Sequence, residues 1–364
     1  MFQEQFFREA IQLGEQGRGR CGINPFIGAL LVKDGRVIGR GYSQKCGKNH
    51  AEIEAILNAQ ESTEGADLYV TMEPCCHFGK TPPCTDAIVK AGIKRVYAGI
   101  KDPNPLVNGK GFEILKAAGI EVMSGFEEEK IKKQLEYYLT YRREHRPFII
   151  MKNAVSLDSK IATGNGESQW ISCPEARVYS HKLRQEAGAV LTGIETVLSD
   201  DPLLNVRLED KVEPVLRIIL DSRLRIPLDS KIVGTASEFP TIAFKRDDYS
   251  DPIKEKTLQE KNIQIKSVPP ETEEFLSLTH LIDELNKLEL PVILIEAGPR
   301  ICSSFIRAGL VDKLYYFIAP KLIGGNQSVF DDLGVDRIAQ SINIRIDSLE
   351  KVGNDLLIIG YVLK

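Results

Sequence analysis

His50-Ala51-Glu52, Glu73-Pro74-Cys75 and Thr81-Pro82-Pro83-Cys84 follow one another within residues 50 to 84. Together they place one imidazole and two thiols near a carboxylate. A catalytic zinc ion uses three protein ligands and keeps its fourth position for water or substrate, whereas a structural zinc ion has four protein ligands. We therefore expect His50, Cys75 and Cys84 to bind Zn2+, and Glu52 to transfer protons.

The order His-x-Glu, Pro-Cys and a second Cys is typical of zinc enzymes that remove an amino group from a nucleobase. Zinc lowers the pKa of its bound water to about 7 and so supplies hydroxide for attack on a ring carbon. Glu52 would accept the water proton and deliver it to the ring nitrogen and the leaving amine. The alternative is a structural zinc site completed by Cys76, Cys46 or His77, which would leave Glu52 without a role. Cys76 also competes with Cys75, and we choose Cys75 because it directly follows a proline, as in the deaminase signature.

The pattern around this stretch predicts how the first half folds. Asp34-Gly35 between two apolar runs predicts a type I′ hairpin turn. Helices and strands then alternate, which indicates a sheet with parallel strands covered by helices. We expect helices over residues 3–16, 50–59, 85–91, 112–118 and 127–143, and strands over residues 26–33, 36–42, 68–72, 95–100 and 120–123. The zinc ligands would then lie at the starts of the two helices that follow the hairpin and strand 68–72.

Length and composition limit the class of protein. With 364 residues, 43% hydrophobic and 27% charged, the chain is typical of a globular protein, and its length favours two domains of roughly 150 to 200 residues. Its 47 basic and 51 acidic side chains give a net charge of −4, so no global positive field attracts nucleic acid. The seven cysteines lack a disulfide framework, and neither a secretory signal nor a long apolar run is present. We expect a cytoplasmic protein without membrane association.

The second half begins where Pro147 follows a charged, amphipathic helix. We place the domain boundary there, with domains over residues 1–145 and 146–364. We expect strands over residues 148–155, 189–192, 216–221, 241–244, 292–296, 314–319 and 356–362, and helices over residues 175–185, 276–287 and 300–308. Residues 232–272 give the weakest sequence signals for secondary structure. The Gly-x-Gly-x-x-Gly at residues 17–22 follows a helix, so it does not predict a Rossmann phosphate loop.

The wide spacing of Cys75 and Cys84, with Asn24-Pro25 and Asp102-Pro103-Asn104-Pro105, resembles the bifunctional deaminase-reductase of bacterial riboflavin biosynthesis. The resemblance covers nearly the whole chain. It implies an N-terminal cytidine-deaminase-like α/β/α sandwich that deaminates 2,5-diamino-6-(5-phosphoribosylamino)pyrimidin-4-one. The residues that it places against this substrate are Asn24, His77, Lys80, Asp102 and Asn104. Each also fits a turn or a cap, and Asp-Pro-Asn-Pro is itself a strong turn signal.

Ser156-Leu157-Asp158, the segment 166–171 and Glu296-Ala297-Gly298-Pro299 resemble the reductase domain of the same family. The resemblance implies a dihydrofolate-reductase-like α/β domain that uses NADPH to reduce the ribosyl group of 5-amino-6-(5-phosphoribosylamino)uracil to ribityl. The implied cofactor contacts are Ala154, Trp170, Thr196, Asp200, Ser222, Gly298, Pro299, Arg300, Ile301, Cys302, Ser303 and Ser304. The implied substrate contacts are Ser168, Arg184, Leu204, Arg207 and Glu296, to which we add Lys152. Without the resemblance, Trp170 would more often be a core residue and the two arginines surface charges.

Two other functions remain open at this point. One is a nucleic-acid-editing zinc deaminase with a C-terminal binding module, against which the net negative charge counts. The other is a non-enzymatic zinc protein, which the open coordination position disfavours. We expect a small-molecule substrate and neither nucleic acid nor membrane as partner. Homo-oligomer formation is implied only by the resemblance.

Overall fold

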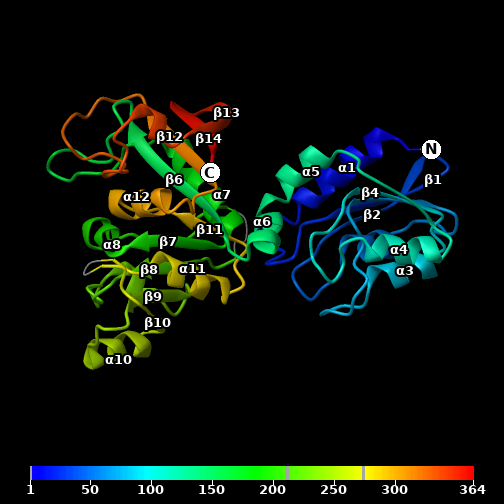
Figure 1. The fold of residues 1–364 in the computed structure, drawn as a ribbon, viewed down its shortest axis with the longest axis horizontal. Helices are drawn as coiled ribbons and strands as arrows, with labels where there is room; N and C mark the ends of the chain where they lie inside the picture. Colours follow the sequence, from blue (N-terminus) through cyan, green and yellow to red (C-terminus); the bar gives the residue numbers. More distant parts are fainter. Residues whose placement is uncertain (1, 210–212, 273–274) are drawn as a thin grey trace. The chain divides into compact units, whose positions relative to one another are not determined.

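The computed structural model describes residues 2–209, 213–272 and 275–364. Contacts divide the chain into two units, one ending at Arg146 and the other beginning at Pro147. Each unit contains one β-sheet covered by helices (Figure 1). Within the described ranges, no helix is long and apolar enough to cross a membrane.

A five-stranded sheet forms the centre of the first unit, in the order β2-β1-β3-β4-β5. The strands are β1 (Gly28–Lys33), β2 (Arg36–Tyr42), β3 (Asp67–Met72), β4 (Arg95–Ile100) and β5 (Glu121–Ser124). β1 pairs antiparallel with β2 and β3, whereas β3, β4 and β5 run parallel. Asp34 and Gly35 join β1 to β2 with φ angles of 50° and 74°, which confirms the predicted type I′ turn.

Helices cover both faces of this sheet and complete the expected α/β/α sandwich. The helices are α1 (Glu4–Glu15), α2 (Ala51–Leu57), α3 (Cys84–Lys90), α4 (Lys110–Ala117), α5 (Glu128–Gln134) and α6 (Glu136–Glu144). α1 and α5 pack on one face, and α2, α3 and α4 on the other (Figure 1). The single helix expected over residues 127–143 is wrong, because Leu135 has φ and ψ of −99° and 17° and separates α5 from α6.

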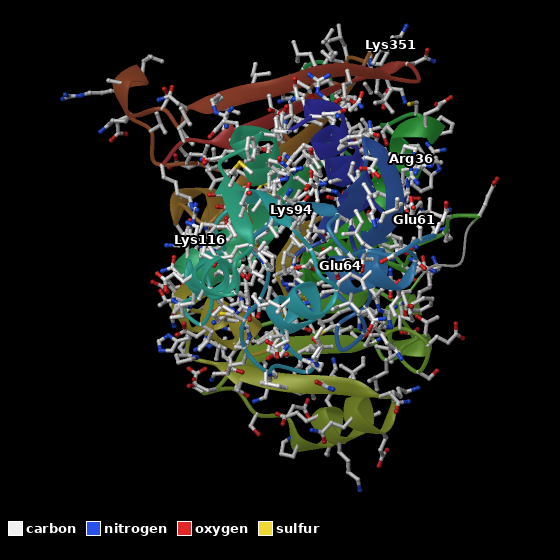
Figure 2. The ribbon with its side chains drawn as sticks, turned by 90° about the vertical axis from the view of Figure 1, so that its right-hand side faces the viewer. Arg36, Glu61, Glu64, Lys94, Lys116 and Lys351 are labelled. Carbon is white, nitrogen blue, oxygen red and sulfur yellow. The ribbon has the colours of Figure 1, made fainter. Side chains whose placement is uncertain are left out.

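A glycine of β2 brings α2 against the sheet. A Cβ atom at Gly41 would lie only 2.1 Å from the carbonyl oxygen of Ala51, so no larger residue fits there. Ala51 and Ala55 are fully buried in this contact region. Because His50 and Glu52 flank Ala51, the close packing also fixes these two candidate site residues. At the other end of the same strand, Arg36 lies 3.5 Å from Glu61 in an exposed ion pair (Figure 2).

The second unit contains a nine-stranded sheet in the order β10-β9-β8-β7-β11-β6-β12-β14-β13. The strands from β10 to β12 in this order are parallel, and the two at the β13 end are antiparallel. The strands are β6 (Phe148–Ser156), β7 (Ala189–Gly193), β8 (Leu216–Leu220), β9 (Thr241–Arg246), β10 (Ile263–Val268), β11 (Val292–Ile295), β12 (Lys313–Ala319), β13 (Ile344–Val352) and β14 (Asp355–Val362). Val190 and Leu191 of β7 are both buried but belong to different hydrophobic clusters, so both faces of the sheet are covered.

The helices of the second unit connect these strands. They are α7 (Pro174–Ala187), α8 (Ile194–Asp200), α9 (Lys231–Gly234), α10 (Pro252–Glu260), α11 (Leu278–Asn286), α12 (Pro299–Arg307) and a short 3-10 helix (Ile338–Gln340). Residues 232–272, where only strand 241–244 was expected, also contain α10 and β10. The sequence did not predict α8, α9 or β13 either.

Candidate active sites

Three metal-binding side chains come together at the helix starts of the first unit. His50 precedes α2, Cys84 begins α3, and Cys75 lies shortly after β3. His50 Nδ1 lies 3.5 Å from Cys75 Sγ and 3.3 Å from Cys84 Sγ, and the three donor atoms are all within 4.8 Å of one another. A nitrogen and a sulfur ligand of a tetrahedral zinc ion are about 3.6 Å apart, as calculated from their bond lengths. The three side chains therefore fit zinc and leave one coordination position open.

The structure distinguishes the two adjacent thiols. Cys75 Sγ faces His50 and accepts the backbone N–H of Cys84 at 3.4 Å. Cys76 Sγ instead lies 3.6 Å from the carbonyl oxygen of Leu106. Hydrogen bonds from the Cys84 and His50 side chains lower the pKa of the Cys75 thiol to about 4, although burial opposes this shift. A thiolate is the form that binds zinc, so the geometry favours Cys75 over Cys76.

Glu52 is a buried carboxylic acid in the first turn of α2, with 4% of its surface exposed. Burial, together with the negative charge of Cys75, raises the pKa of Glu52 to about 7. A group with a pKa near neutrality can both accept and donate a proton during a reaction. Glu52 interacts with Cys84 but is not one of the three clustered donors.

Thr81 makes a contact to which sequence reasoning gave no role. Its Oγ1 lies 3.4 Å from Nε2 of His50, the ring nitrogen that faces away from the two thiols. A hydrogen bond to the non-ligating nitrogen of a metal-binding histidine fixes its tautomer and ring orientation. The segment that supplies Cys84 thus also supplies a partner for His50.

Asp102 and Asn104, predicted to contact the substrate, are buried in the loop that follows β4. Oδ1 of Asp102 accepts hydrogen bonds from Tyr138 Oη at 2.8 Å and from the backbone N–H of Asn104 at 2.9 Å. Oδ1 of Asn104 accepts the N–H of Leu106 at 3.1 Å. One oxygen of each side chain therefore stabilises the turn, which is the structural role that the sequence also allowed.

The other predicted substrate contacts of this unit lie on different loops. His77 and Lys80 lie between Cys75 and Cys84, and Asn24 precedes β1. Nδ1 of His77 is buried without a hydrogen-bond partner among the residues that the structure describes. Buried polar atoms are nearly always paired, so this nitrogen is suited to a bound ligand. Lys80 is exposed, and its Nζ lies 3.5 Å from the thiol of Cys46.

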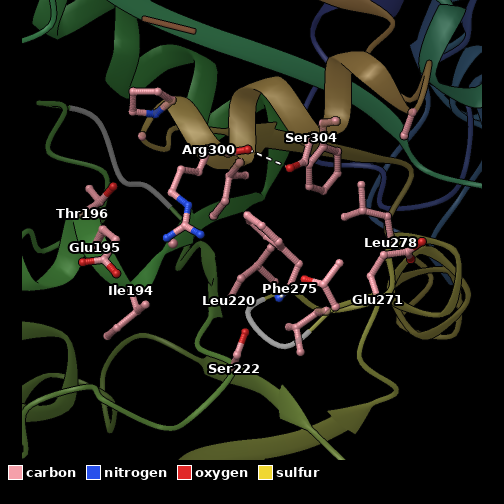
Figure 3. A pocket seen from close by; sticks show the side chains of 18 of the residues that line it. Ile194, Glu195, Thr196, Leu220, Ser222, Glu271, Phe275, Leu278, Arg300 and Ser304 are labelled. Atoms are coloured by element: carbon pink, nitrogen blue, oxygen red, sulfur yellow. Dashed lines mark hydrogen bonds between the residues drawn. The ribbon is translucent and has the colours of Figure 1, made fainter. Parts of the chain in front are cut away.

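A cavity of about 810 Å³ lies in the second unit beside the carboxyl ends of β7 and β8 and the start of α12 (Figure 3). Its volume is in the range of small-molecule sites, and the carboxyl ends of parallel strands are where α/β folds bind ligands. Arg300 and Phe275 are both in its wall, with the guanidinium carbon 4.7 Å from the ring centre. The predicted cofactor contacts in its lining are Thr196, Ser222, Gly298, Pro299, Arg300, Ile301 and Ser304.

Two glycines keep backbone and side chains close together in this cavity wall. A Cβ atom at Gly298 would lie 4.0 Å from Thr196 Oγ1, so these two residues face each other. At Gly193 a Cβ atom would lie 2.4 Å from Cδ1 of Ile301, so a larger residue would require the Ile301 side chain to move. Gly193 was not predicted as a site residue, although its position at the end of a buried strand could have indicated it.

Other predicted cofactor contacts are outside this lining: Ala154, Trp170, Asp200, Cys302 and Ser303. The Cys302 thiol lies 3.3 Å from the carbonyl oxygen of Ala297, and the Ser303 hydroxyl accepts the N–H of Asp331 at 2.9 Å. Both side chains therefore contact protein on the buried side of α12. Trp170 is 61% exposed rather than a core residue, and the guanidinium of Arg177 lies 4.7 Å from its ring centre.

A buried charged cluster forms around Glu296, just after β11. Arg184 donates to it through Nε at 2.6 Å and through Nη2 at 2.9 Å. Burial alone would raise the pKa of Glu296, but Arg184 and Lys152 lower it to about 2. Burial lowers the pKa of Lys152, and the charge of Glu296 opposes that shift. The parallel pairing of Ile295 with Met151 places Lys152 and Glu296 at the same level of the sheet.

His181 and Asn205 extend this cluster, and sequence reasoning missed both residues. The carbonyl oxygen of Asn205 lies 2.9 Å from Nη1 of Arg184 and 3.2 Å from Nδ1 of His181. Burial, and then the charges of Arg184 and Arg207, lower the pKa of His181 to about 4. Arg207 donates to the Asn205 side chain at 2.6 Å.

The remaining predicted substrate contacts, Ser168 and Leu204, have different surroundings. The Ser168 hydroxyl donates to Asp200 at 3.0 Å, which joins a predicted substrate contact to a predicted cofactor contact. Leu204 is buried, with a positive φ of 49°.

Comparison with known proteins identifies both halves of the chain. The sequence model described as "Cytidine and deoxycytidylate deaminase zinc-binding region" matches residues 1–100, and the one described as "RibD C-terminal domain" matches residues 147–358. The riboflavin biosynthesis protein RibD of Aquifex aeolicus is 42% identical over 355 residues, which cover 98% of this chain and 97% of that protein. RibD of Escherichia coli is 36% identical over 369 residues, covering 98% of each chain.

Solved structures of similar proteins match this chain over nearly its full length. Acinetobacter baumannii RibD has a TM-score of 0.89 and 34% identity, with 99% of each chain covered. A Thermotoga maritima protein, described as a diaminohydroxyphosphoribosylaminopyrimidine deaminase and 5-amino-6-(5-phosphoribosylamino)uracil reductase, has a TM-score of 0.86 and 33% identity, with 99% of this chain and 98% of that one covered. The chain therefore belongs to the RibD family of riboflavin biosynthesis proteins, with a zinc-binding deaminase region followed by a RibD reductase domain.

Proposed function

We propose that this protein catalyses two consecutive reactions on one phosphorylated pyrimidine. The first unit hydrolytically deaminates 2,5-diamino-6-(5-phosphoribosylamino)pyrimidin-4-one, and the second reduces the ribosyl group of 5-amino-6-(5-phosphoribosylamino)uracil to ribityl. The observation that carries the proposal is the cluster of His50, Cys75 and Cys84, with one open position and the buried Glu52 nearby. The description of the similar Thermotoga protein as a deaminase and reductase supports the pairing of the two reactions.

Glu52 moves the proton in the deamination. Zinc bound by the three clustered donors would lower the pKa of a water molecule in the open position to about 7. The carboxylate of Glu52 would carry the two protons of the attacking water in turn, the first to the ring nitrogen and the second to the leaving amine. The products are ammonia and the corresponding uracil.

We assign recognition of this substrate to three loops. Lys80 is exposed and cationic, which suits the 5′-phosphate. The Nδ1 of His77, which has no hydrogen-bond partner among the described residues, offers a second polar contact from the same loop. Asn24 and Asn104 carry amides that can both donate and accept hydrogen bonds with the base, and Asp102 supports the turn that presents Asn104.

We assign the cavity of the second unit to NADPH, whose nicotinamide supplies the hydride. The start of α12 offers backbone N–H groups for a phosphate, and Gly298 leaves space in front of them. Thr196 adds a hydroxyl from the opposite wall, and Arg300 adds a positive charge. Ser222, just after β8, also lines the cavity (Figure 3).

The charged cluster around Glu296, which precedes Gly298 of the cavity wall by two residues, is assigned to the ribosyl phosphate. Arg207 suits the phosphate because a guanidinium can bind it through two N–H groups, and Arg184, whose Nε and Nη2 are bound to Glu296, adds its positive charge. Burial lowers the pKa of Lys152, whose charge interacts with that of Glu296, so Lys152 can donate a proton to an oxygen of the opening sugar. Ser168 and Leu204 complete the proposed substrate contacts, with Ser168 tied to Asp200.

We further propose a small-molecule substrate rather than a nucleic acid, and association of two copies. The net charge of −4 supports the first statement. The second rests on β13, an edge strand whose Ile346 and Leu349 are 55% and 60% exposed. Their register opposite Gly360 and Ile358 places both on one face, beside the exposed Leu356 of β14. An apolar face on an open sheet edge is suited to pairing with its own copy.

One assay tests the two activities. The purified protein is incubated with Zn2+, the diaminopyrimidine ribonucleotide and NADPH, while ammonia release and nicotinamide absorbance are followed. We expect ammonia with or without NADPH, and NADPH oxidation only when the pyrimidine is present. Ammonia without NADPH oxidation would refute the reductase assignment, and the absence of both signals would refute the whole proposal.

A substitution tests the role of Glu52. Glu52→Ala should retain zinc and lose ammonia release by about 10²- to 10⁴-fold, because the proton carrier is gone and the ligands remain. Glu61→Ala removes an exposed carboxylate outside the site and serves as the matched control. Loss of zinc from Glu52→Ala would mean that this residue is a ligand.

A further inference from the structure

Glu73 is a buried carboxylate that the proposed chemistry does not use. It directly follows β3 and is 4% exposed. Its Oε2 accepts the backbone N–H groups of Asp102 at 3.2 Å and of Gly109 at 2.9 Å. Its Oε1 accepts those of Gly111 at 3.0 Å and of Phe112 at 3.4 Å. One side chain therefore satisfies four main-chain donors.

All four donors belong to one continuous segment, the loop after β4 and the start of α4. This loop carries Asn104, which we assign to the substrate base. On the other side, Glu73 is joined through Pro74 to Cys75, one of the three clustered metal-binding residues. The backbone N–H of Glu73 is fixed by the carbonyl oxygen of Ile100 at 2.9 Å. Glu73 thus connects the segment of a zinc-site thiol with the proposed substrate loop.

Two glycines show how tightly this loop is held. Gly109 has a φ of 94°, in the left-handed region that glycine adopts most readily. A Cβ atom at Gly111 would lie 2.3 Å from the carbonyl oxygen of Pro74. The loop backbone therefore packs directly on the Glu73-Pro74 segment, where only a glycine fits.

We propose that Glu73 is a positioning residue of the deaminase, which holds the loop from Asp102 to Gly109 so that Asn104 meets the base. This inference rests on the deaminase function proposed above. Buried N–H groups need an acceptor, so the loop cannot keep this course once the carboxylate is lost. Tyr138 supports the same loop from another side through its 2.8 Å hydrogen bond to Asp102.

Glu73→Gln tests the inference because it keeps the size of the side chain and replaces one oxygen by an NH2 group. That group would face two backbone N–H groups and repel them. We expect KM for the pyrimidine to rise about tenfold, with a smaller change in kcat, because hydrogen bonds to the charged group are lost. Zinc content, and the absorption spectrum of the cobalt-substituted protein, should match the wild type, since the ligands are untouched. The reductase activity of the same chain should also be unchanged.

Glu113→Gln is the matched control. Glu113 is an exposed carboxylate in the first turn of α4, and it accepts none of the four bonds described above. The same change of charge at the same helix start should leave KM, kcat and zinc content at wild-type values. A rise in KM for Glu113→Gln equal to that for Glu73→Gln would overturn the positioning role in favour of a general charge effect.

Two further outcomes would overturn the inference: a wild-type KM in Glu73→Gln, or loss of zinc from that variant. If Glu73→Gln does not fold, Tyr138→Phe decides, because it removes only the hydroxyl that holds Asp102. It should raise KM about threefold with unchanged zinc content, because the loop loses one of the hydrogen bonds that hold it. An unchanged KM in Tyr138→Phe would then count against positioning of this loop. A wild-type protein that releases no ammonia would refute the proposed function itself, whereas an active wild type with an unaffected variant would refute only this inference.

Discussion

Arg184 and Glu296 form a bidentate ion pair, with Nε 2.6 Å from Oε1 and Nη2 2.9 Å from Oε2. Both side chains are only 13% exposed. Removing one member of such a pair leaves a buried charge without a partner, which costs about 3–5 kcal/mol. The pair therefore links the stability of the second unit to the side chains that we assign to the substrate.

Replacing Arg184 by Met should lower the free energy of unfolding of the second unit by about 3–5 kcal/mol and abolish NADPH oxidation. Urea unfolding followed by circular dichroism measures the first effect. The double variant Arg184→Met/Glu296→Leu should recover part of the stability but none of the reductase activity, because the two charges of the pair are removed together while Lys152 loses its carboxylate partner. Ammonia release by the first unit is the internal control. Full reductase activity in the double variant would contradict the assigned role.

The same pair predicts a dependence of stability on acid. The pKa of Glu296 is about 2 in the folded protein and about 4.3 in an unfolded chain. The ionised form therefore stabilises the fold fully above the unfolded pKa, and this contribution is lost as the pH falls from there towards 2. The double variant should show a smaller loss of stability over that interval than the wild type. Identical slopes would mean that Glu296 is not held ionised by its partners.

His181 predicts a second pH interval in which stability changes, between pH 6.5 and 4. Its pKa is lowered from 6.5 to about 4, so the unfolded chain takes up a proton in this interval while the folded protein does not. Stability should therefore fall as the pH drops from 6.5 to 4 and be unaffected by His181 above 6.5. His181→Gln should flatten this slope in pH-dependent unfolding experiments. A slope unaltered by His181→Gln would contradict the shifted pKa.

Thr81→Val tests whether the contact to His50 supports the zinc site. Loss of the hydroxyl removes the hydrogen-bond partner of His50 Nε2. Zinc affinity should therefore fall about 10- to 100-fold, the effect typical of mutating a residue that hydrogen-bonds to a metal-binding histidine. Competition with a chelator measures the affinity directly. Thr63→Val, which removes a hydroxyl bound to the carbonyl of Ala91 away from the metal cluster, is the control. Equal zinc affinities for Thr81→Val and the wild type would show that this hydroxyl does not support His50.

The sequence predicted those features that depend on the type of the residue itself. His50, Cys75 and Cys84 were identifiable because few residues bind zinc, and Asp34-Gly35 because few dipeptides adopt two positive φ angles. The role of Glu73 was not predictable in this way. Its four partners are backbone N–H groups of a distant loop, and a main-chain donor leaves no mark in the sequence.

The helices and strands that were not predicted from the sequence were missed for specific reasons. α10 could have been predicted, since Asp251 caps the helix through the N–H of Lys254 and Pro252 occupies its first turn. β13 was harder to recognise. A register shift between Ile346 and Ser348 interrupts the alternation of apolar and polar side chains, and the apolar residues of this strand are exposed rather than buried.

The exposed face of β13 predicts the oligomeric state. Ile346 and Leu349 lie on one face of the hairpin whose turn is near Lys351 (Figure 2), so replacing both by lysine places two like charges where two copies would meet. We expect the wild type to sediment as a dimer and Ile346→Lys/Leu349→Lys as a monomer, with ammonia release retained because the hairpin belongs to the second unit. Ile253→Lys makes the same kind of change at an 82% exposed position on α10 and should remain dimeric. A dimer that survives the double substitution would place the interface elsewhere, and a monomeric wild type would remove the reason for an apolar edge of this kind.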